Sequence, residues 1–63
     1  MSRTQKQIIK STEEWLDERW TIMNMENPPR PADKAYYEGA VKAVEFLGYD
    51  WTRDKDGKHD IRN

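Results

Sequence analysis

The 63-residue sequence predicts an α+β fold in which an antiparallel two-helix hairpin packs on a C-terminal two-stranded β-hairpin. Apolar residues recur at helical spacing in two stretches, a cluster of prolines separates these stretches, and an Asp-Gly pair follows the second one. We expect a single small domain over residues 1–63. Its predicted parts are a helix over about 4–25, a proline-rich turn over 26–32, a helix over about 33–47 and a β-hairpin over about 49–62.

The N-terminal helix is predicted from two adjacent apolar ridges with a seven-residue spacing. The ridges are Ile8, Trp15 and Ile22, and Ile9, Leu16 and Met23. Three pairs match the capping-box spacing at its start: Ser2 with Gln5, Thr4 with Gln7, and Ser11 with Glu14. We favour a start before Ile8, because Ile8 and Ile9 continue the ridges. Trp20 lies off the first ridge, which predicts partial exposure.

The second helix is predicted from a stripe of apolar residues at three- and four-residue steps. The stripe is Ala35, Tyr36, Ala40, Ala43, Val44 and Leu47. Gly39 lies inside the helix, where glycine costs about 1 kcal/mol relative to alanine. We therefore expect another helix to cross closely over Gly39, in preference to a ligand binding there. Gly48 is placed to end the helix in the left-handed conformation.

Two connections complete the predicted fold. The prolines at 28, 29 and 31 favour a rigid turn between antiparallel helices over a proline-rich ligand. In the hairpin, a two-residue turn at 56–57 would place Trp51 and Ile61 on opposite faces. A type I turn over 54–57 places Trp51 opposite Ile61, and we choose it because it gives one apolar face. The predicted core is Ile9, Leu16, Met23, Ala40, Ala43, Leu47, Tyr49, Trp51 and Ile61.

Length and composition restrict the possible classes of protein. A chain of this length buries only about 60% of its unfolded surface, so self-association or a larger partner is expected to add support. The sequence contains no cysteine, which excludes disulfides and thiolate zinc sites. A formal net charge of −1 gives no overall attraction to nucleic acid or anionic lipid. The sequence has no apolar run long enough to span a membrane, and a cytoplasmic location is expected.

The sequence offers little catalytic chemistry. His59 is the only histidine, and the two serines are distant from it, so no nucleophile–base pair can be proposed. A calcium-loop interpretation of residues 52–63 fails, because Thr52 and Asn63 occupy positions that need carboxylates. We expect neither an enzyme nor a metal or cofactor site.

Three non-catalytic functions remain. The leading hypothesis is a protein–protein interaction module whose surface includes Glu13, Asp17, Trp20 and Tyr37, with Trp20 as an anchor beside carboxylates. The competing interpretation of this acidic stretch is a solvated surface without a partner. The second hypothesis is a small nucleic-acid-binding protein that uses the basic residues of the hairpin, although aspartates interleave with them. Those basic residues are Arg53, Lys55, Lys58 and Arg62. The third hypothesis is self-assembly as a small structural homodimer.

Three short motifs resemble small uncharacterised proteins carried by prophages of Gram-positive bacteria. They are the segments 37–40, 47–51 and 57–59, all of which lie in the C-terminal half of the chain. The resemblance implies no activity and no catalytic residues. It implies a phage accessory protein that inhibits or regulates a bacterial host protein, such as a component of host defence.

Overall fold

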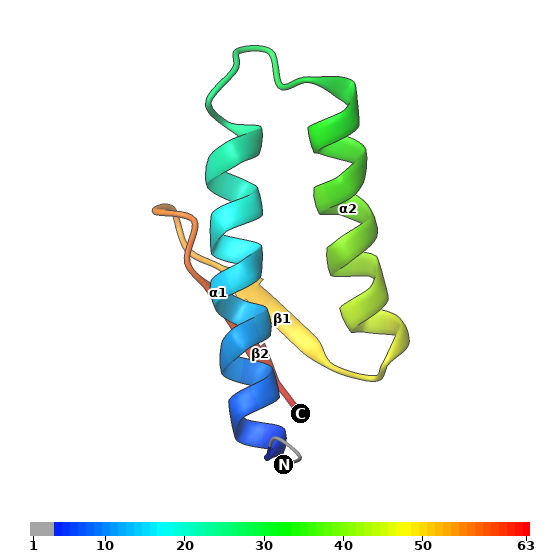
Figure 1. The fold of residues 1–63 in the computed structure, drawn as a ribbon. Coiled ribbons are helices and arrows are strands. Elements are labelled where there is room, and N and C mark those ends of the chain that lie inside the picture. The colour runs from blue at the N-terminus through cyan, green and yellow to red at the C-terminus, as the bar shows by residue number, and fades with distance from the viewer. Residues whose placement is uncertain (1–3) are drawn as a thin grey trace.

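The computed structural model describes residues 4–63 and shows two helices followed by an antiparallel β-hairpin (Figure 1). The elements are α1 (Gln5–Met23), α2 (Pro31–Phe46), β1 (Asp50–Arg53) and β2 (His59–Arg62). The predicted α+β class and the order of its elements are therefore confirmed.

Helix α1 begins at a capping box. The Thr4 hydroxyl accepts from the Gln7 backbone N–H at 3.2 Å, and the Gln7 side chain accepts from the Thr4 backbone N–H at 3.0 Å. Two of the N–H groups that a helix start leaves unpaired are satisfied in this way. The longer of the predicted helices is confirmed, and Thr4 is its cap.

Helix α2 begins at a proline and ends at a glycine. Pro31 occupies the first turn, where its missing N–H costs nothing. Gly48 has a φ of +92°, and its N–H donates to the Glu45 carbonyl at 2.9 Å. The next N–H, of Tyr49, donates to the Val44 carbonyl at 3.3 Å. This pair of bonds is a Schellman motif, so the predicted helix end is confirmed.

The hairpin adopts the predicted register, with Trp51 opposite Ile61 and Arg53 opposite His59. Its turn is closed by the Gly57 N–H, which donates to the Asp54 carbonyl at 3.1 Å. Gly57 has a φ of +88°, the left-handed conformation that this turn requires. The apolar pair Trp51 and Ile61 therefore lies on one face of the hairpin.

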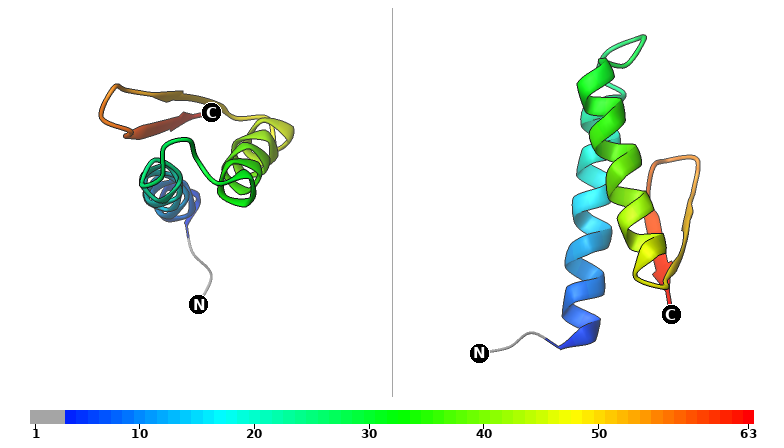
Figure 2. Two further views of the ribbon diagram at one scale, coloured as in Figure 1. Left: turned by 90° about the horizontal axis from the view of Figure 1, so that it is seen from above. Right: turned by 90° about the vertical axis from the view of Figure 1, so that its right-hand side faces the viewer.

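The molecule has two layers, with the helix pair in one and the hairpin in the other (Figure 2). Strand β2 contacts α1 and strand β1 contacts α2. Among residues 4–63, no element covers the side of the helix pair that faces away from the hairpin. The core lies between the layers and consists of Leu16, Met23, Tyr37, Ala40, Val41, Val44 and Ile61, with Ile9, Trp20, Tyr49 and Trp51 packed at its edge.

The buried stripe of α2 differs from the prediction. Ala35, Tyr36, Ala43 and Leu47 are exposed, whereas Tyr37 and Val41 are buried together with Ala40 and Val44 of the predicted stripe. The buried stripe is thus rotated toward Tyr37 by somewhat less than one position, which is about 100° around the helix. The reason is that α2 packs against both α1 and the hairpin, and contact with the hairpin buries the Tyr37 side of the helix.

The expectation for Gly39 is also wrong within this chain. Gly39 is exposed, and a Cβ built on it would have no heavy atom within 4 Å. Helix α1 lies on another side of α2. Within residues 4–63, neither helix combines the length and the apolar character that crossing a membrane requires.

Candidate functional site

Two predicted site residues of α1, Glu13 and Asp17, bind the free edge of β2. Asp17 Oδ1 accepts from the His59 backbone N–H at 2.7 Å, and Glu13 Oε2 accepts from the Ile61 backbone N–H at 2.8 Å. Positions four apart in a helix are separated by about 6 Å and positions two apart in a strand by about 6.5 Å, so the two spacings match closely. These carboxylates satisfy N–H groups that β1 does not pair, and they cover an edge that would otherwise be exposed.

His59 joins this edge to the interior. Its side chain is 0% exposed, and its Nδ1 lies 2.8 Å from Asp17 Oδ1. Because a carboxylate only accepts, Nδ1 carries a proton, and Nε2 lies 2.6 Å from the Tyr37 hydroxyl oxygen. The Tyr37 oxygen accepts in turn from Arg53 at 2.9 Å. We call Glu13, Asp17, Tyr37, Arg53 and His59 the polar seam.

Trp20 lies beneath the hairpin turn. The Arg53 guanidinium carbon is 3.8 Å from the centroid of the Trp20 ring, which is a cation–π contact. On the same indole, a Cβ added at Gly57 would come within 2.2 Å of Trp20 Cδ1. The Trp20 ring therefore packs directly against the turn backbone, and only glycine fits above it.

The polar seam corrects the prediction of a partner-binding surface. The structure brings Glu13, Asp17, Trp20 and Tyr37 together, but it uses them to attach the hairpin to the helices. Tyr37 is only 4% exposed, so it does not belong to a surface. An Asp–His–Tyr relay suggests proton transfer, but the buried His59 ring gives a substrate no access. The sequence signal for this attachment was the i, i+4 spacing of two acidic residues on α1, Glu13 and Asp17.

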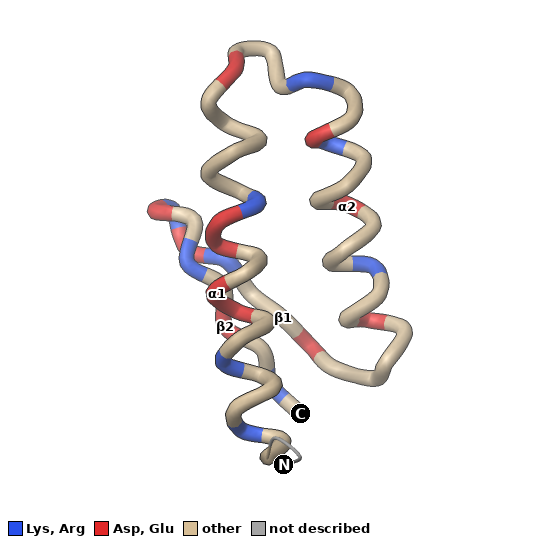
Figure 3. Tube along the Cα trace, viewed as in Figure 1, with Lys and Arg blue, Asp and Glu red and all other residues tan. Residues whose placement is uncertain are grey.

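The four basic residues of the nucleic-acid hypothesis do not form one exposed basic surface. Figure 3 shows acidic and basic positions interleaved along the hairpin. Arg53 is held in the polar seam, and Arg62 is paired with Asp60 at 3.0 Å. Lys55 and Lys58 are exposed beside the turn, where aspartates interleave with them in the chain. A reader of nucleic acid usually presents a coherent basic surface, so this geometry does not favour the hypothesis.

Large apolar side chains are exposed on the side of the helix pair away from the hairpin. Trp15 is two positions from both Glu13 and Asp17, which places it about 160° around α1 from each of them. Its ring meets Tyr36 of α2 edge to face, with centroids 5.8 Å apart. We call Ile8, Trp15, Tyr36, Ala43, Phe46 and Leu47 the open helical face. Its large members are 50% (Ile8), 39% (Trp15), 52% (Tyr36), 84% (Phe46) and 76% (Leu47) exposed.

An apolar hollow of about 70 Å³ opens where Ile8 of α1 and Leu47 of α2 approach each other. Its other walls are Ile9, Thr12, Val44, Tyr49 and Ile61. Pockets for small molecules usually measure about 300–1,000 Å³, so this hollow is too small for such a ligand. Its volume suits the end of a single side chain.

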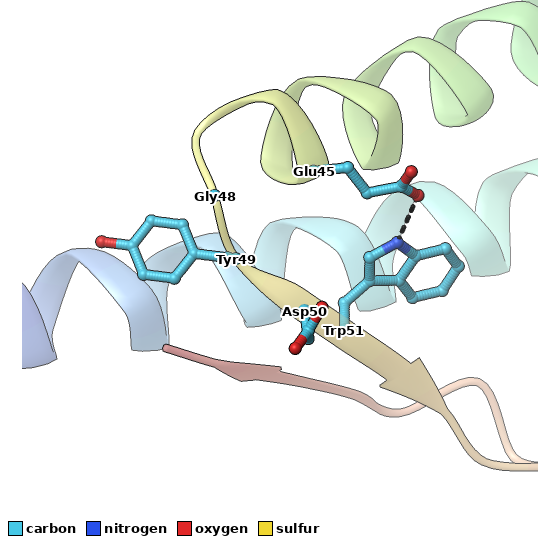
Figure 4. A pocket seen from close by; sticks show the side chains of 5 residues that line it. All are labelled: Glu45, Gly48, Tyr49, Asp50 and Trp51. Carbon is cyan, nitrogen blue, oxygen red and sulfur yellow. Dashed lines mark hydrogen bonds between the residues drawn. The ribbon is translucent and has the colours of Figure 1, made fainter.

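A second hollow, of about 400 Å³, lies between the end of α2 and the start of β1 (Figure 4). Its walls include the carboxylates of Glu45 and Asp50 and the rings of Tyr49 and Trp51. The Trp51 indole N–H donates to Glu45 at 2.8 Å across this space. Glu45 is therefore already hydrogen-bonded within the chain. The hollow is a wide, open polar depression at the junction of α2 and β1.

Across residues 4–63, no group of three or more histidine, aspartate or glutamate side chains is arranged to hold a metal ion. No protein-family model, curated protein or solved structure matches this chain. The resemblance to prophage proteins therefore stays a prediction. The open helical face, with its apolar hollow, is the candidate functional site.

Proposed function

We propose that this chain is a non-catalytic protein–protein interaction module that docks through the open helical face. The observation that carries the proposal is the gathering of five large, exposed apolar side chains on one side of a two-helix layer. Large apolar patches on small proteins commonly mark interaction sites. Trp and Tyr are also the residues that most often dominate binding energy at protein interfaces.

The arrangement of Tyr36 supports the proposal. Its ring lies against Trp15 on one side, and the Arg19 guanidinium carbon is 4.2 Å from its centroid. Arg19 is held by Asp33 at 3.6 Å. An exposed aromatic that is already fixed loses little conformational freedom on binding, which favours affinity.

The prophage resemblance adds a biological role to the proposal, namely inhibition or regulation of a bacterial host protein. In that case the host protein would cover the open helical face. The polar seam is not part of the proposed docking surface, because its groups are already hydrogen-bonded within the chain.

Site-specific photo-crosslinking in the producing cells tests the proposal. A photoreactive residue at Leu47 lies on the open helical face, and one at Lys58 lies on the exposed hairpin turn as the matched control. We expect a discrete protein adduct from position 47 and none from position 58. Adducts that form only from position 58, or that form equally from both, would overturn the proposal.

A further inference from the structure

The two edges of the β-hairpin differ in how the rest of the chain covers them. On β2, the N–H groups of His59 and Ile61 point away from β1 and donate to carboxylates of α1. Strand β1 lies outermost in both views of Figure 2, and among residues 4–63 no element covers its outer edge. The chain therefore protects one edge of the sheet and leaves the other uncovered.

The register of the hairpin identifies the backbone groups on this outer edge. Trp51 lies opposite Ile61, and Arg53 lies opposite His59. Residues directly opposite each other in an antiparallel pair either exchange both of their hydrogen bonds or exchange neither. Because Ile61 and His59 donate their N–H groups to α1, both pairs are of the second kind. The N–H and C=O groups of Trp51 and Arg53 therefore point outward, and none has a hydrogen-bond partner within residues 4–63.

The charges of β1 leave the outer edge acidic. The strand carries one acid, Asp50, and one base, Arg53. The Arg53 guanidinium turns back toward the helices, where it donates to the Tyr37 hydroxyl at 2.9 Å and lies 3.8 Å from the centroid of the Trp20 ring. Asp50 is exposed and has no ion-pair partner in the described part of the chain. A strand that joined this edge would therefore meet an unneutralised carboxylate.

The hollow of about 400 Å³ lies beside the same end of the edge (Figure 4). It is large enough to receive a long side chain, and its walls include the Asp50 carboxylate and the rings of Tyr49 and Trp51. Carboxylates and aromatic rings are the groups that bind a guanidinium, which pairs with the first and stacks on the second. Glu45 already accepts from the Trp51 indole and contacts Lys42 at 3.8 Å, so Asp50 is the carboxylate left for a ligand.

We infer that the outer edge of β1 binds an extended segment of another protein, which adds a third strand to the sheet and places an arginine opposite Asp50. Backbone pairing of this kind satisfies the outward groups of Trp51 and Arg53. Directly opposite residues share a face of the sheet, so the arginine would meet the Asp50 carboxylate and reach the hollow. This edge is separate from the open helical face, so the inference does not depend on the proposed function.

A second copy of this chain does not supply the required cation. Two β1 edges can pair antiparallel about a two-fold axis at any of the residues 50–53. For these four axes, the residue of the other copy opposite Asp50 is Asp50, Thr52, Asp54 or Asp56. Three of the axes place two carboxylates opposite each other, which is destabilising, and none places a basic residue there. The charge of the edge therefore favours a basic strand from a different protein.

Nuclear magnetic resonance of the isotope-labelled chain with synthetic peptides tests the inference. The probe is a blocked heptapeptide of alternating threonine and valine with a central arginine, because these flanking residues favour strands. We expect the amide signals of Trp51 and Arg53 to shift and their exchange with solvent deuterium to slow. Signals from Trp15 and Leu47 of the open helical face should not move. The same peptide with N-methyl groups on the two residues beside the arginine lacks the N–H groups needed for pairing and should cause no shift.

A change of charge tests the place of the arginine. The wild-type chain should bind the arginine peptide about fivefold or more tightly than its analogue with a central glutamate, and Asp50→Arg should reverse this preference. Asp56→Arg makes the same change at an exposed position of the turn and should keep the wild-type preference. Both variants should retain the wild-type circular dichroism, since both side chains are exposed.

Three results would overturn the inference. The first is equal binding of the arginine and glutamate peptides by the wild-type chain. The second is the absence of shifts at Trp51 and Arg53 with millimolar arginine peptide, or shifts that occur only on the open helical face. The third is protection of the Trp51 and Arg53 amides from exchange in the free chain at every dilution, which would show that the edge is already paired.

Discussion

The Asp17 carboxylate accepts two hydrogen bonds from His59, one from the backbone N–H at 2.7 Å and one from ring Nδ1 at 2.8 Å. A single side chain of α1 thus fixes both the position of β2 and the orientation of a buried ring. The fold depends on this contact because a two-stranded hairpin alone is marginal in water. The hairpin is held by burial of Ile61 and by the polar seam together.

Replacing Asp17 with alanine should strongly destabilise the protein. The change leaves the His59 N–H and Nδ1 without their partner, and each unsatisfied buried group costs about 1–3 kcal/mol. This is a large share of the few kcal/mol expected for so small a domain. Urea unfolding followed by circular dichroism measures the change. Glu18→Ala, at an exposed neighbouring position, should shift the midpoint little, and equal shifts for both variants would contradict the prediction.

Two glycine-to-alanine substitutions should change the free energy of unfolding in opposite directions. Gly57→Ala forces an alanine into a positive φ and against the Trp20 ring, so a loss of about 2 kcal/mol or more is expected. Gly39→Ala adds a methyl group to open space in a helix, so a gain of roughly 0.5–1 kcal/mol is expected. Thermal unfolding at low protein concentration measures both without a contribution from association. A tolerated Gly57→Ala would show that the turn does not pack on Trp20.

The sequence predicted the parts of the fold that depend on local chemistry. The left-handed Gly48 and the Trp51–Ile61 register each follow from residues close together in the chain, and the capping box at Thr4 is one of three that the spacing allowed. The rotation of the α2 stripe was missed because it depends on contacts between distant elements. Tyr37 is buried because its hydroxyl meets His59, 22 positions away.

The candidate site was only partly predictable for the same reason. The carboxylates of Glu13 and Asp17 resemble a docking surface until β2 is placed beside them. Ala43 and Leu47 of the open helical face were predicted to be core because their spacing is that of a buried ridge. Spacing shows that a helix face is apolar, but it does not show whether the same chain covers that face.

The turn carboxylate of Asp54 should contribute to stability in a pH-dependent way. Hydrogen bonds from the backbone N–H groups of Lys58 and Asp56 hold the pKa of Asp54 below its usual value of about 4. Because the folded-state pKa is the lower one, this stabilisation is present above about pH 4 and is lost as the pH falls through the folded-state pKa. Asp54→Asn keeps an accepting oxygen that does not titrate, so its melting temperature should fall less steeply in acid. A melting temperature of Asp54→Asn that fell as steeply in acid as that of the wild type would contradict the prediction.

The Tyr37 hydroxyl should matter for stability, whereas the Tyr36 hydroxyl should not. Tyr37→Phe leaves Nε2 of the buried His59 ring without its partner, so a loss of about 1–3 kcal/mol is expected. Tyr36→Phe is the matched control, because the contacts of the Tyr36 ring with Trp15 and Arg19 do not require its hydroxyl. Urea unfolding of both variants gives the comparison. If the two variants lost the same stability, Tyr37 would act only through its ring, and the hydrogen bonds of the polar seam would not hold the hairpin in place.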